Sequence, residues 1–542
     1  MLQKINMVLL SILMISIIGC EDDFLETKPT DAISAADALS TVVNMKLILN
    51  GLHRQMYAQS PLPGGSNSRA GEHYFIPMFD VLSGDLIHSA PANGWMTGEL
   101  QWTAHSVATS LTCEQLWYQR YHFIASANSI INTVIEDGLI IDDELSEVLG
   151  QAYAYKAWAY YRLVTSYAKG YLIGNPSTDL GVPLLFKTES PFTSEPRSTV
   201  EEVYDQMEAD INQSITYFQN ATSRASGDPK YKSQLNINVA QGIKARIALS
   251  KGDWSTAASA AAEAYEGFPL MDEDDWKSGF NTNDLSEVIW GGNVVDTETT
   301  FFRSYFYYIS PTFNGSQNRG NPKLFNIEKY NQIPDTDYRK DVVLPLAPNT
   351  NSAASNGQGG SYESDPNYDN EEDFEAAYEE IINTYGMTSA HNTHPYMHVK
   401  FLNQNPGSID PDDVIYMRSS EMYLIEAEAL TMLNDIAGAQ EALNPLGSTR
   451  DSAYDVALYN TQEAMLEHIK FQRYVELYGE GFSWHDHIRW DEGIDLTNSG
   501  ASEVYYQDGF MQERPSLNDE WVFKIPQAEI DANPNITEAD QN

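Results

Sequence analysis

Hydrophobic positions along this chain recur mainly with a helical period. Apolar side chains three, four or seven places apart run through residues 116–134 and 200–215, which puts them on one face of an α-helix. Both segments are therefore predicted to be amphipathic helices, and Ser198 and Glu201 have the spacing of a capping box for the second. The two apolar faces consist of Leu116, Phe123, Ile124, Ala127, Ile131 and Val134, and of Val200, Val203, Met207, Ile211 and Ile215.

The alternation typical of β-strands is scarce. Its clearest examples are residues 287–290 and 521–525, both short. Further helical patterns cover residues 145–167 and 461–478. The fold class predicted is mainly α, with a few short strands.

A faint internal repeat refines that prediction. Shifting the sequence by 182 positions lays Ala245 on Ala427 and Asp253 on Asp435. It also lays Ala257 on Ala439 and Ala260 on Ala442. Each copy reads as a helical hairpin; the first has a helix over residues 238–251 and an Ala-rich helix over 255–264. Small side chains permit close packing, so we expect tetratricopeptide-like pairs stacked into a right-handed α-α superhelix, although no regular period is present.

Two stretches escape the helical pattern. Residues 60–105 and 291–373 combine Pro, Gly, Asn and Ser with aromatic residues, and the part from Asn349 to Asp373 is predicted to be a mobile surface loop. We expect one folded domain over residues 34–542, with loop-rich insertions at these two places. Long loops on a rigid frame are common positions for binding sites.

The N-terminus has the features of an export signal. Lys4 precedes an apolar run from Met7 to Ile18 that is too short to span a bilayer. The run ends in Gly19-Cys20, as a lipoprotein processing site does. We expect residues 1–19 to be removed, Cys20 to carry the lipid anchor, and residues 20–33 to form a tether.

Composition narrows the range of possible partners and bonds. The chain has 32 basic and 77 acidic residues, a formal net charge of −45, which repels nucleic-acid phosphates. Nucleic acid is therefore excluded as a partner. Cys113 is the only cysteine besides Cys20, so no intramolecular disulfide is expected once Cys20 is acylated, and Cys113 is predicted to be a buried apolar residue.

Both irregular stretches carry residue types that suit a sugar, which needs flat aromatic faces and hydrogen-bonding side chains. Trp95 lies in a Gly-flanked turn that would leave its ring exposed, and is the best single candidate. Trp254 and Trp290 are assigned to the core instead. The candidate ligand-binding residues are Asp85, Asn93 and Trp95 in the first stretch, and Phe301, Tyr305, Tyr307, Tyr308, Phe313 and Arg319 in the second.

Other chemistry finds little support. His391, His394 and His398 have helical spacing, but Pro395 disfavours a continuous helix there, and His485-Asp486-His487 has the spacing of a strand. No metal site and no cofactor are predicted; a structural calcium ion at Asp365, Asp369 and Asp373 would lack the usual loop template. Carboxylates are abundant, but no nucleophile elbow, metalloprotease helix or phosphate-binding loop is present. We therefore predict no enzyme activity.

Several segments together resemble the SusD/RagB family, surface lipoproteins that Bacteroidetes pair with a TonB-dependent transporter. The resemblance covers essentially the whole chain. It is carried by Trp117-x3-Tyr121-x2-Ile124-x3-Asn128, Ala157-x2-Tyr160-Tyr161-x-Leu163, Gly181-Val182-Pro183-Leu184, Arg418-x2-Glu421-Met422-Tyr423-Leu424, Arg473-x2-Glu476-Leu477-x2-Glu480-Gly481 and Ile525-Pro526-x2-Glu529. Gln472 and Phe482-Ser483 depart from the family pattern.

The resemblance implies a helical domain that closes as a lid over a SusC-like transporter barrel and binds an oligosaccharide on loops. It also implies an outer-membrane, cell-surface position, since Glu21-Asp22-Asp23 after Cys20 resembles the surface-export signal of these lipoproteins. Two alternatives stay open, a peptide-capturing RagB-like member and an adhesive or structural lipoprotein. The sequence does not name the ligand.

Overall fold

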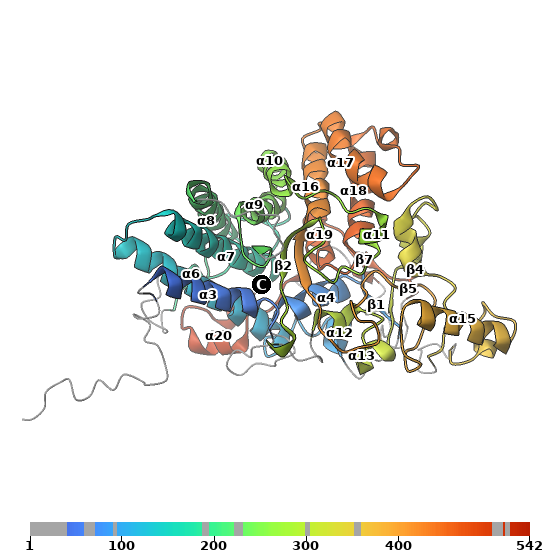
Figure 1. The fold of residues 1–542 in the computed structure, drawn as a ribbon. Coiled ribbons are helices and arrows are strands. Elements are labelled where there is room, and N and C mark those ends of the chain that lie inside the picture. The colour runs from blue at the N-terminus through green and yellow to red at the C-terminus, as the bar shows by residue number, and fades with distance from the viewer. Residues whose placement is uncertain are drawn as a thin grey trace, which may run out of the picture.

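The computed structural model describes residues 39, 41–58, 71–89, 95–186, 194–221, 231–298, 304–351, 359–500, 513–514 and 521–541. In this part of the chain helices predominate, as predicted (Figure 1). They are α3 (Val42–Gln55), α4 (Glu72–Leu82), α5 (Thr97–Leu100), α6 (Leu111–Glu136), α7 (Asp143–Tyr167), α8 (Val200–Asn220), α9 (Ile237–Lys251), α10 (Trp254–Tyr265), α11 (Glu273–Trp276), α12 (Tyr305–Ile309), α13 (Ser316–Arg319), α14 (Ile327–Tyr330), α15 (Glu371–Thr384), α16 (Ser419–Met432), α17 (Ile436–Arg450), α18 (Gln462–Leu477), α19 (Ser483–Trp490) and α20 (Gln527–Ala532).

The long helices form a continuous stack. Neighbours in the chain pack against each other from α6 to α10, and α16 then packs on α10 and continues the row through α17 and α18 (Figure 1). A segment of about 150 residues thus separates two helices that lie side by side. That segment, together with residues 71–110, builds the less regular half of the molecule.

The repeat predicted from the 182-residue shift is present. The turn between α9 and α10 has Gly252 at φ 81°, and Asn434 takes the equivalent left-handed position at φ 61° between α16 and α17. Asp253 and Asp435 then cap the following helices through their side chains. The three aligned alanines are buried in both copies, so the small residues do permit the close packing of the hairpins.

The capping box of α8 lies one residue later than predicted. The hydroxyl of Thr199 accepts from the Glu202 N–H, and the Glu202 carboxylate accepts from the Thr199 N–H. Ser198 is unsuitable because its backbone is already paired with Gly181 and Val182. The chain therefore stays extended through Thr199, and the helix begins at Val200.

Two other local predictions are wrong. Residues 72–82 form α4 inside the stretch predicted to be irregular; every residue of this helix is buried, so it lacks the polar face by which helices are recognised. Residues 521–525 are largely buried but form no strand and pair with none in the described part of the chain. Phe523 and Lys524 donate instead to the backbone of Ser166 and His105.

Short paired strands connect separate segments of the irregular half. β2 (Val288–Gly292) pairs antiparallel with β6 (Val414–Arg418), which directly precedes α16. A small sheet has the order β1-β3-β5-β4, formed by Ile87–His88, Lys323–Leu324, Met397–His398 and Val343–Leu344. β7 (Ile494–Asp495) pairs with β8 (Glu513–Arg514). The segment 349–373 is anchored where it is described, because buried Asp365 accepts from the Asn349 N–H at 2.8 Å.

A cluster of buried ion pairs joins the two halves. Arg418 at the end of β6 donates to Glu287 at 2.8 Å, to Glu476 of α18 at 2.6 Å and to Glu480 at 2.7 Å. Arg339 and Arg450 also contact Glu476. Burial alone would raise the pKa of Glu476, but the three guanidinium groups hold it well below its usual range. We call Glu287, Arg339, Arg418, Arg450, Glu476 and Glu480 the core ion cluster.

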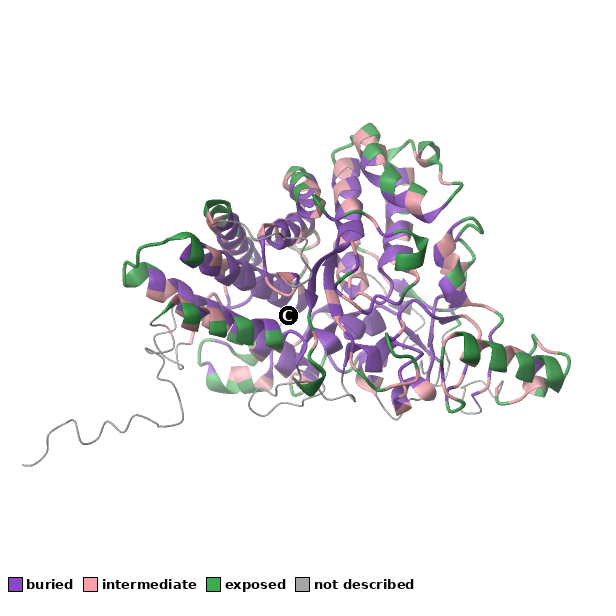
Figure 2. Cartoon of the chain, viewed as in Figure 1, coloured by how far each residue is buried: buried purple, intermediate pink, exposed green. Residues whose placement is uncertain are grey.

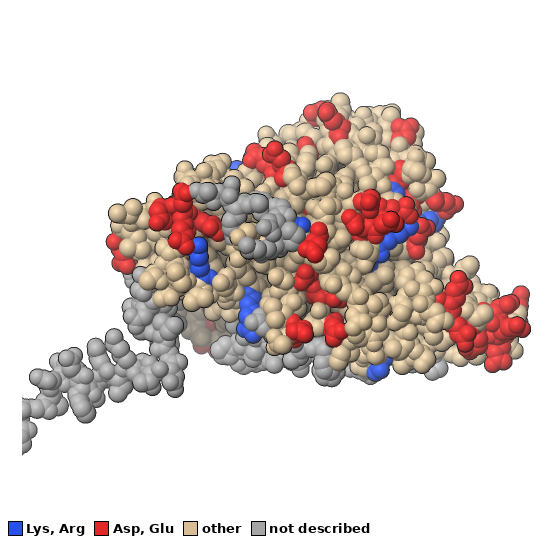
Figure 3. Space-filling model, viewed as in Figure 1, with Lys and Arg blue, Asp and Glu red and all other residues tan. Residues whose placement is uncertain are grey.

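Buried residues fill the interior of both halves (Figure 2). Acidic side chains lie in several separate places on the face shown in Figure 3, including α15. Cys113 and Trp290 are buried, as predicted, and Trp254 is half-buried against the core. The cysteine pKa is raised to about 12 by burial, so Cys113 is an unreactive core thiol.

Candidate functional site

The two stretches predicted to bind ligand meet at Trp95. Its ring lies edge-on to Tyr307 and Tyr308 of α12, with centroid distances of 5.6 and 6.1 Å. Tyr308 in turn lies edge-on to Tyr74 of α4 at 5.5 Å. Segments more than 200 residues apart in the sequence thus form one aromatic cluster. Trp95 is half-buried at the edge of this cluster.

The other aromatic candidates of this cluster are part of the core. Tyr305 is 4% exposed, Tyr307 1%, and Tyr308 and Phe313 0%, so their faces cannot stack on a ligand in this structure. Each ring packs against other aromatic rings, and the Tyr305 hydroxyl donates to the Gly479 carbonyl at 2.8 Å. Burial thus contradicts the predicted stacking role of these four residues, and it is Tyr307 and Tyr308 that contact the ring of Trp95.

Polar groups accompany the cluster on the side of Phe313. Arg319, half-buried at the end of α13, donates to the Asn314 side chain at 3.4 Å, and its carbonyl accepts from Asn392 at 2.7 Å. His391 lies 3.2 Å from the Phe313 carbonyl through Nε2. The loop that holds His391 and Asn392 was not singled out as a ligand-binding region from the sequence. Asn93 and Phe301 lie outside the described residues, as does Cys20.

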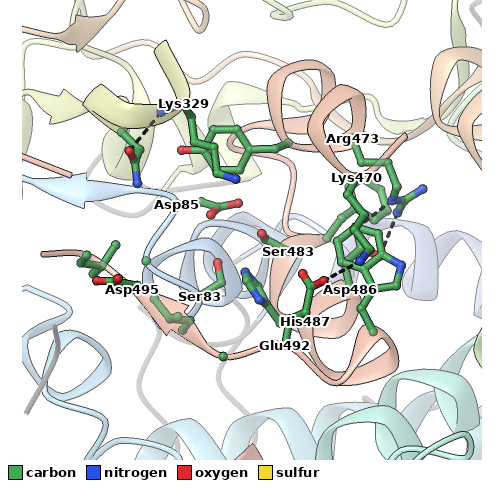
Figure 4. A pocket seen from close by; sticks show the side chains of 18 of the residues that line it. Ser83, Asp85, Lys329, Lys470, Arg473, Ser483, Asp486, His487, Glu492 and Asp495 are labelled. Atoms are coloured by element: carbon green, nitrogen blue, oxygen red, sulfur yellow. Dashed lines mark hydrogen bonds and ion pairs between the residues drawn. The ribbon is translucent and has the colours of Figure 1, made fainter. Parts of the chain in front are cut away.

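Asp85 does not belong to the aromatic cluster. It follows α4 and lines a cavity of about 300 Å³ between α14, α18, α19 and β7 (Figure 4). The close-up shows Asp85, Ser83 and Ser483 pointing into one space, with Lys329 reaching toward Asp85 from α14. Gly84, between Ser83 and Asp85, has φ 78° and lies against Leu496. The wall of the cavity is therefore tightly packed at this position.

Two carboxyl groups in the wall of this cavity have pKa values shifted in opposite directions. Burial raises the pKa of Asp85 to about 7, even though a hydrogen bond from Ser483 and the charge of Lys329 both lower it. The neighbouring Asp486 behaves in the opposite way: burial would raise its pKa, but Arg473 and Arg489 hold it below its usual value. Burial thus raises the pKa of Asp85, whereas two arginines lower that of Asp486 in the same wall.

Comparison with known families gives two matches. Residues 23–249 match a SusD-like family described as "Starch-binding associating with outer membrane". Residues 306–542 match the SusD family, which includes RagB. Together the two SusD-type matches span most of the chain. The chain belongs to the SusD/RagB family.

Relatives and solved structures of the SusD/RagB family agree with this. SusD-like protein P38 of Formosa agariphila is 23% identical over 70% of this chain and 73% of its own, and SusD-like protein P25 is 22% identical over 79% of each. A SusD-like carbohydrate binding protein from Bacteroides vulgatus superposes with a TM-score of 0.73 at 20% identity, covering 92% of this chain and 98% of the other. Surface glycan-binding protein A from Bacteroides thetaiotaomicron, in complex with laminarihexaose, superposes with a TM-score of 0.64 at 15% identity, covering 92% and 99%.

The SusD/RagB motif residues now have structural roles. Arg418, Glu476 and Glu480 belong to the core ion cluster, and Arg473 pairs with Asp486 at 2.8 Å. The charged positions by which the family is recognised thus hold α18 and α19 in place, apart from the aromatic cluster.

The histidine groups do not assemble a metal site. His391 and His394 lie in a loop and His398 in β5, consistent with the helix-breaking effect of Pro395. His485 and His487 lie on α19, a helix, and not on the strand that their spacing would suit. Within the described residues there is no group of three or more His, Cys, Asp or Glu side chains placed to share a metal ion. None of the helices in that part is both long and apolar enough to cross a bilayer.

Proposed function

We propose that this protein is a cell-surface lipoprotein that captures an oligosaccharide at the Trp95 aromatic cluster and passes it to a SusC-like TonB-dependent transporter barrel. The observation that carries the proposal is the ring of Trp95, half-buried and supported edge-on by Tyr307 and Tyr308. A supported ring keeps its orientation, so little entropy is lost when a sugar face stacks on it.

Three findings support a carbohydrate as the ligand class. The family matched by the N-terminal half is described as starch-binding and outer-membrane associated. One solved relative is named a SusD-like carbohydrate binding protein, and another was solved with laminarihexaose. Binding without bond cleavage is the activity that follows, since the role is capture and delivery.

The test is a single substitution at the surface ring. Trp95→Ala should weaken oligosaccharide binding by about 1–3 kcal/mol, which is on the order of tenfold to a hundredfold in Kd. Calorimetry with laminarihexaose and a starch-derived maltooligosaccharide measures it. Trp254→Ala is the matched control, because Trp254 is also a half-buried tryptophan but lies in the helical stack. Equal affinities of the wild type and Trp95→Ala for a glycan that binds would refute the platform.

Delivery and location need separate experiments. Co-purification with an outer-membrane barrel from detergent extracts would support the transporter partner. Protease treatment of intact cells should remove the domain if Cys20 anchors it on the outer surface, whereas protection until lysis would place it in the periplasm. Peptides bound to the purified protein, with no affinity for any glycan, would favour the peptide-capturing alternative.

A further inference from the structure

The cavity beside Asp85 has the size of a site for one small molecule. Its volume of about 300 Å³ lies at the lower end of the range for ligand pockets. An oligosaccharide that stacks along a surface would not fit inside it. The cavity and Trp95 share no wall residue, so an occupant of the cavity would leave the surface ring untouched.

Most charges around the cavity already have partners. Asp486 accepts from Arg473 at 2.8 Å and from Arg489 at 2.9 Å, and Glu492 accepts from Lys470. Glu328 accepts from Asn498 at 3.1 Å. These pairs fix the wall without needing an occupant, and they leave the remaining polar groups to be explained.

Two groups have unused bonding capacity. Nη1 of Arg473, a residue 3% exposed, is buried without a hydrogen-bond partner in the described part of the chain, whereas the Tyr474 hydroxyl accepts a hydrogen bond from the backbone of Asn326. The ammonium of Lys329 lies 5.6 Å from the centre of the Tyr474 ring, and no carboxylate lies within ion-pair distance of it in the described part of the chain. Asp85 has Ser483 as its hydrogen-bond donor. Buried polar groups without partners cost free energy, which a ligand able to bond with them would recover.

We infer that this cavity is a second ligand site, which binds one neutral sugar residue through Asp85, Lys329 and Arg473. A sugar hydroxyl both donates and accepts, so one ring can donate to Asp85 and accept from Lys329 and Arg473 at the same time. Trp490 and Tyr474 add aromatic surface to the wall. The inference rests on the proposed function for the class of ligand, and it adds a pocket for a single unit to the surface platform for a chain.

The charge balance of the wall argues against an anionic ligand. Five carboxyl groups face three permanent cations, so a phosphate or a sugar acid would meet net repulsion. A ligand with an ammonium group would suit that balance but would leave the Arg473 N–H and the Lys329 ammonium without acceptors. The charged residues counted are Asp85, Glu328, Asp486, Glu492 and Asp495 against Lys329, Lys470 and Arg473.

The experiment compares single sugars with chains on the full-length protein. Glucose, galactose, mannose and xylose are titrated individually, at millimolar concentration, with binding followed by ligand-observed NMR and by calorimetry. The two variants are Asp85→Asn, which keeps the shape of the side chain, and Lys329→Met, which removes the ammonium and keeps its length. Each should weaken binding of the preferred monosaccharide by about tenfold or more, the effect of losing one charged hydrogen bond. Thermal unfolding of both variants verifies that they fold.

Trp95→Ala separates this inference from the proposed function. Monosaccharide binding should be unchanged in that variant, while binding of laminarihexaose or a maltooligosaccharide falls. If monosaccharides bind and no chain does, the surface platform fails and the pocket stands. The inference is overturned if none of the four sugars binds, if Asp85→Asn and Lys329→Met both bind the preferred sugar as the wild type does, or if only glucosamine binds. A crystal soaked with the preferred sugar should show density against Asp85.

Discussion

Two groups of buried charges lie against the C-terminal half of α18, and they differ in how the charges are balanced. In the core ion cluster Glu476 is 0% exposed and contacts Arg339, Arg418 and Arg450. In the cavity Asp85 is 6% exposed and has no arginine beside it. The pKa shifts follow: that of Glu476 falls well below its usual range, and that of Asp85 rises to about 7.

In a family rich in charged motifs, this difference distinguishes buried charges that stabilise the fold from buried charges that can contact a ligand. A buried carboxylate surrounded by guanidinium groups has all its bonds inside the protein, so it can hold helices together but has nothing left for a ligand. A buried carboxyl group at a cavity has lost its water without gaining a counterion. Such a group lowers the stability of the empty protein, which is a common property of binding sites.

The largest expected effect is at the core ion cluster. Glu476→Gln should lower the free energy of unfolding by about 3–5 kcal/mol, because three guanidinium groups lose a shared charge partner in the interior. Urea unfolding at pH 7 measures it. Glu467→Gln is the control on the same helix, since Glu467 is 64% exposed and should change stability by no more than about 0.5 kcal/mol. A loss at Glu476 as small as that of the control would mean that the cluster does not hold the two halves together.

An effect that depends on pH is expected at the cavity. The folded-state pKa of Asp85 lies at about 7 against 3.8 for an ordinary Asp, so the folded protein holds this proton between those values and the unfolded chain releases it. Wild-type stability should therefore fall as pH rises from about 4 to about 7, by up to about 1.4 kcal/mol per pH unit from this group. Asp85→Asn lacks the group and should lack that part of the slope.

Urea titrations of both proteins at several pH values isolate the contribution of Asp85, since all other groups are shared. Near pH 4 the free energies of unfolding of the two proteins should differ only by a constant offset. As the pH rises above 4, the wild type should become less stable relative to Asp85→Asn. Parallel curves across the whole range would show that Asp85 is not desolvated as the structure has it.

The smallest effect is expected from an exposed pair. Lys46 of α3 and Glu144 of α7 contact each other at 2.8 Å, with side chains 36% and 54% exposed. Lys46→Ala should cost about 0.2–1 kcal/mol, and the cost should shrink in 1 M salt because water and ions screen the pair. A cost that approached the one at Glu476, or that salt left unchanged, would contradict the view that burial sets the size of these effects.

Local patterns explain how much of the fold could be predicted. The hairpin repeat was found because its signals are short-range: an Asp cap follows a left-handed residue, and small residues face the neighbouring helix. α4 was missed because burial on all sides removes the polar face that marks a helix. Residues 521–525 were taken for a strand because alternation along the sequence does not reveal whether a partner strand exists.

The sequence by itself determined the family, the helical stack, and the fact that Trp95 lies in one of two aromatic-rich loops. Only the tertiary structure decided which of those aromatic residues face solvent: Tyr307 and Tyr308 are covered from outside their own segment by α4 and Trp95. The tertiary structure also places Asp85 in the wall of a cavity built with α14, α18 and α19, and not in the aromatic cluster. Burial and pairing are sums over residues far apart in the chain, so a pattern of neighbours along the sequence cannot fix them.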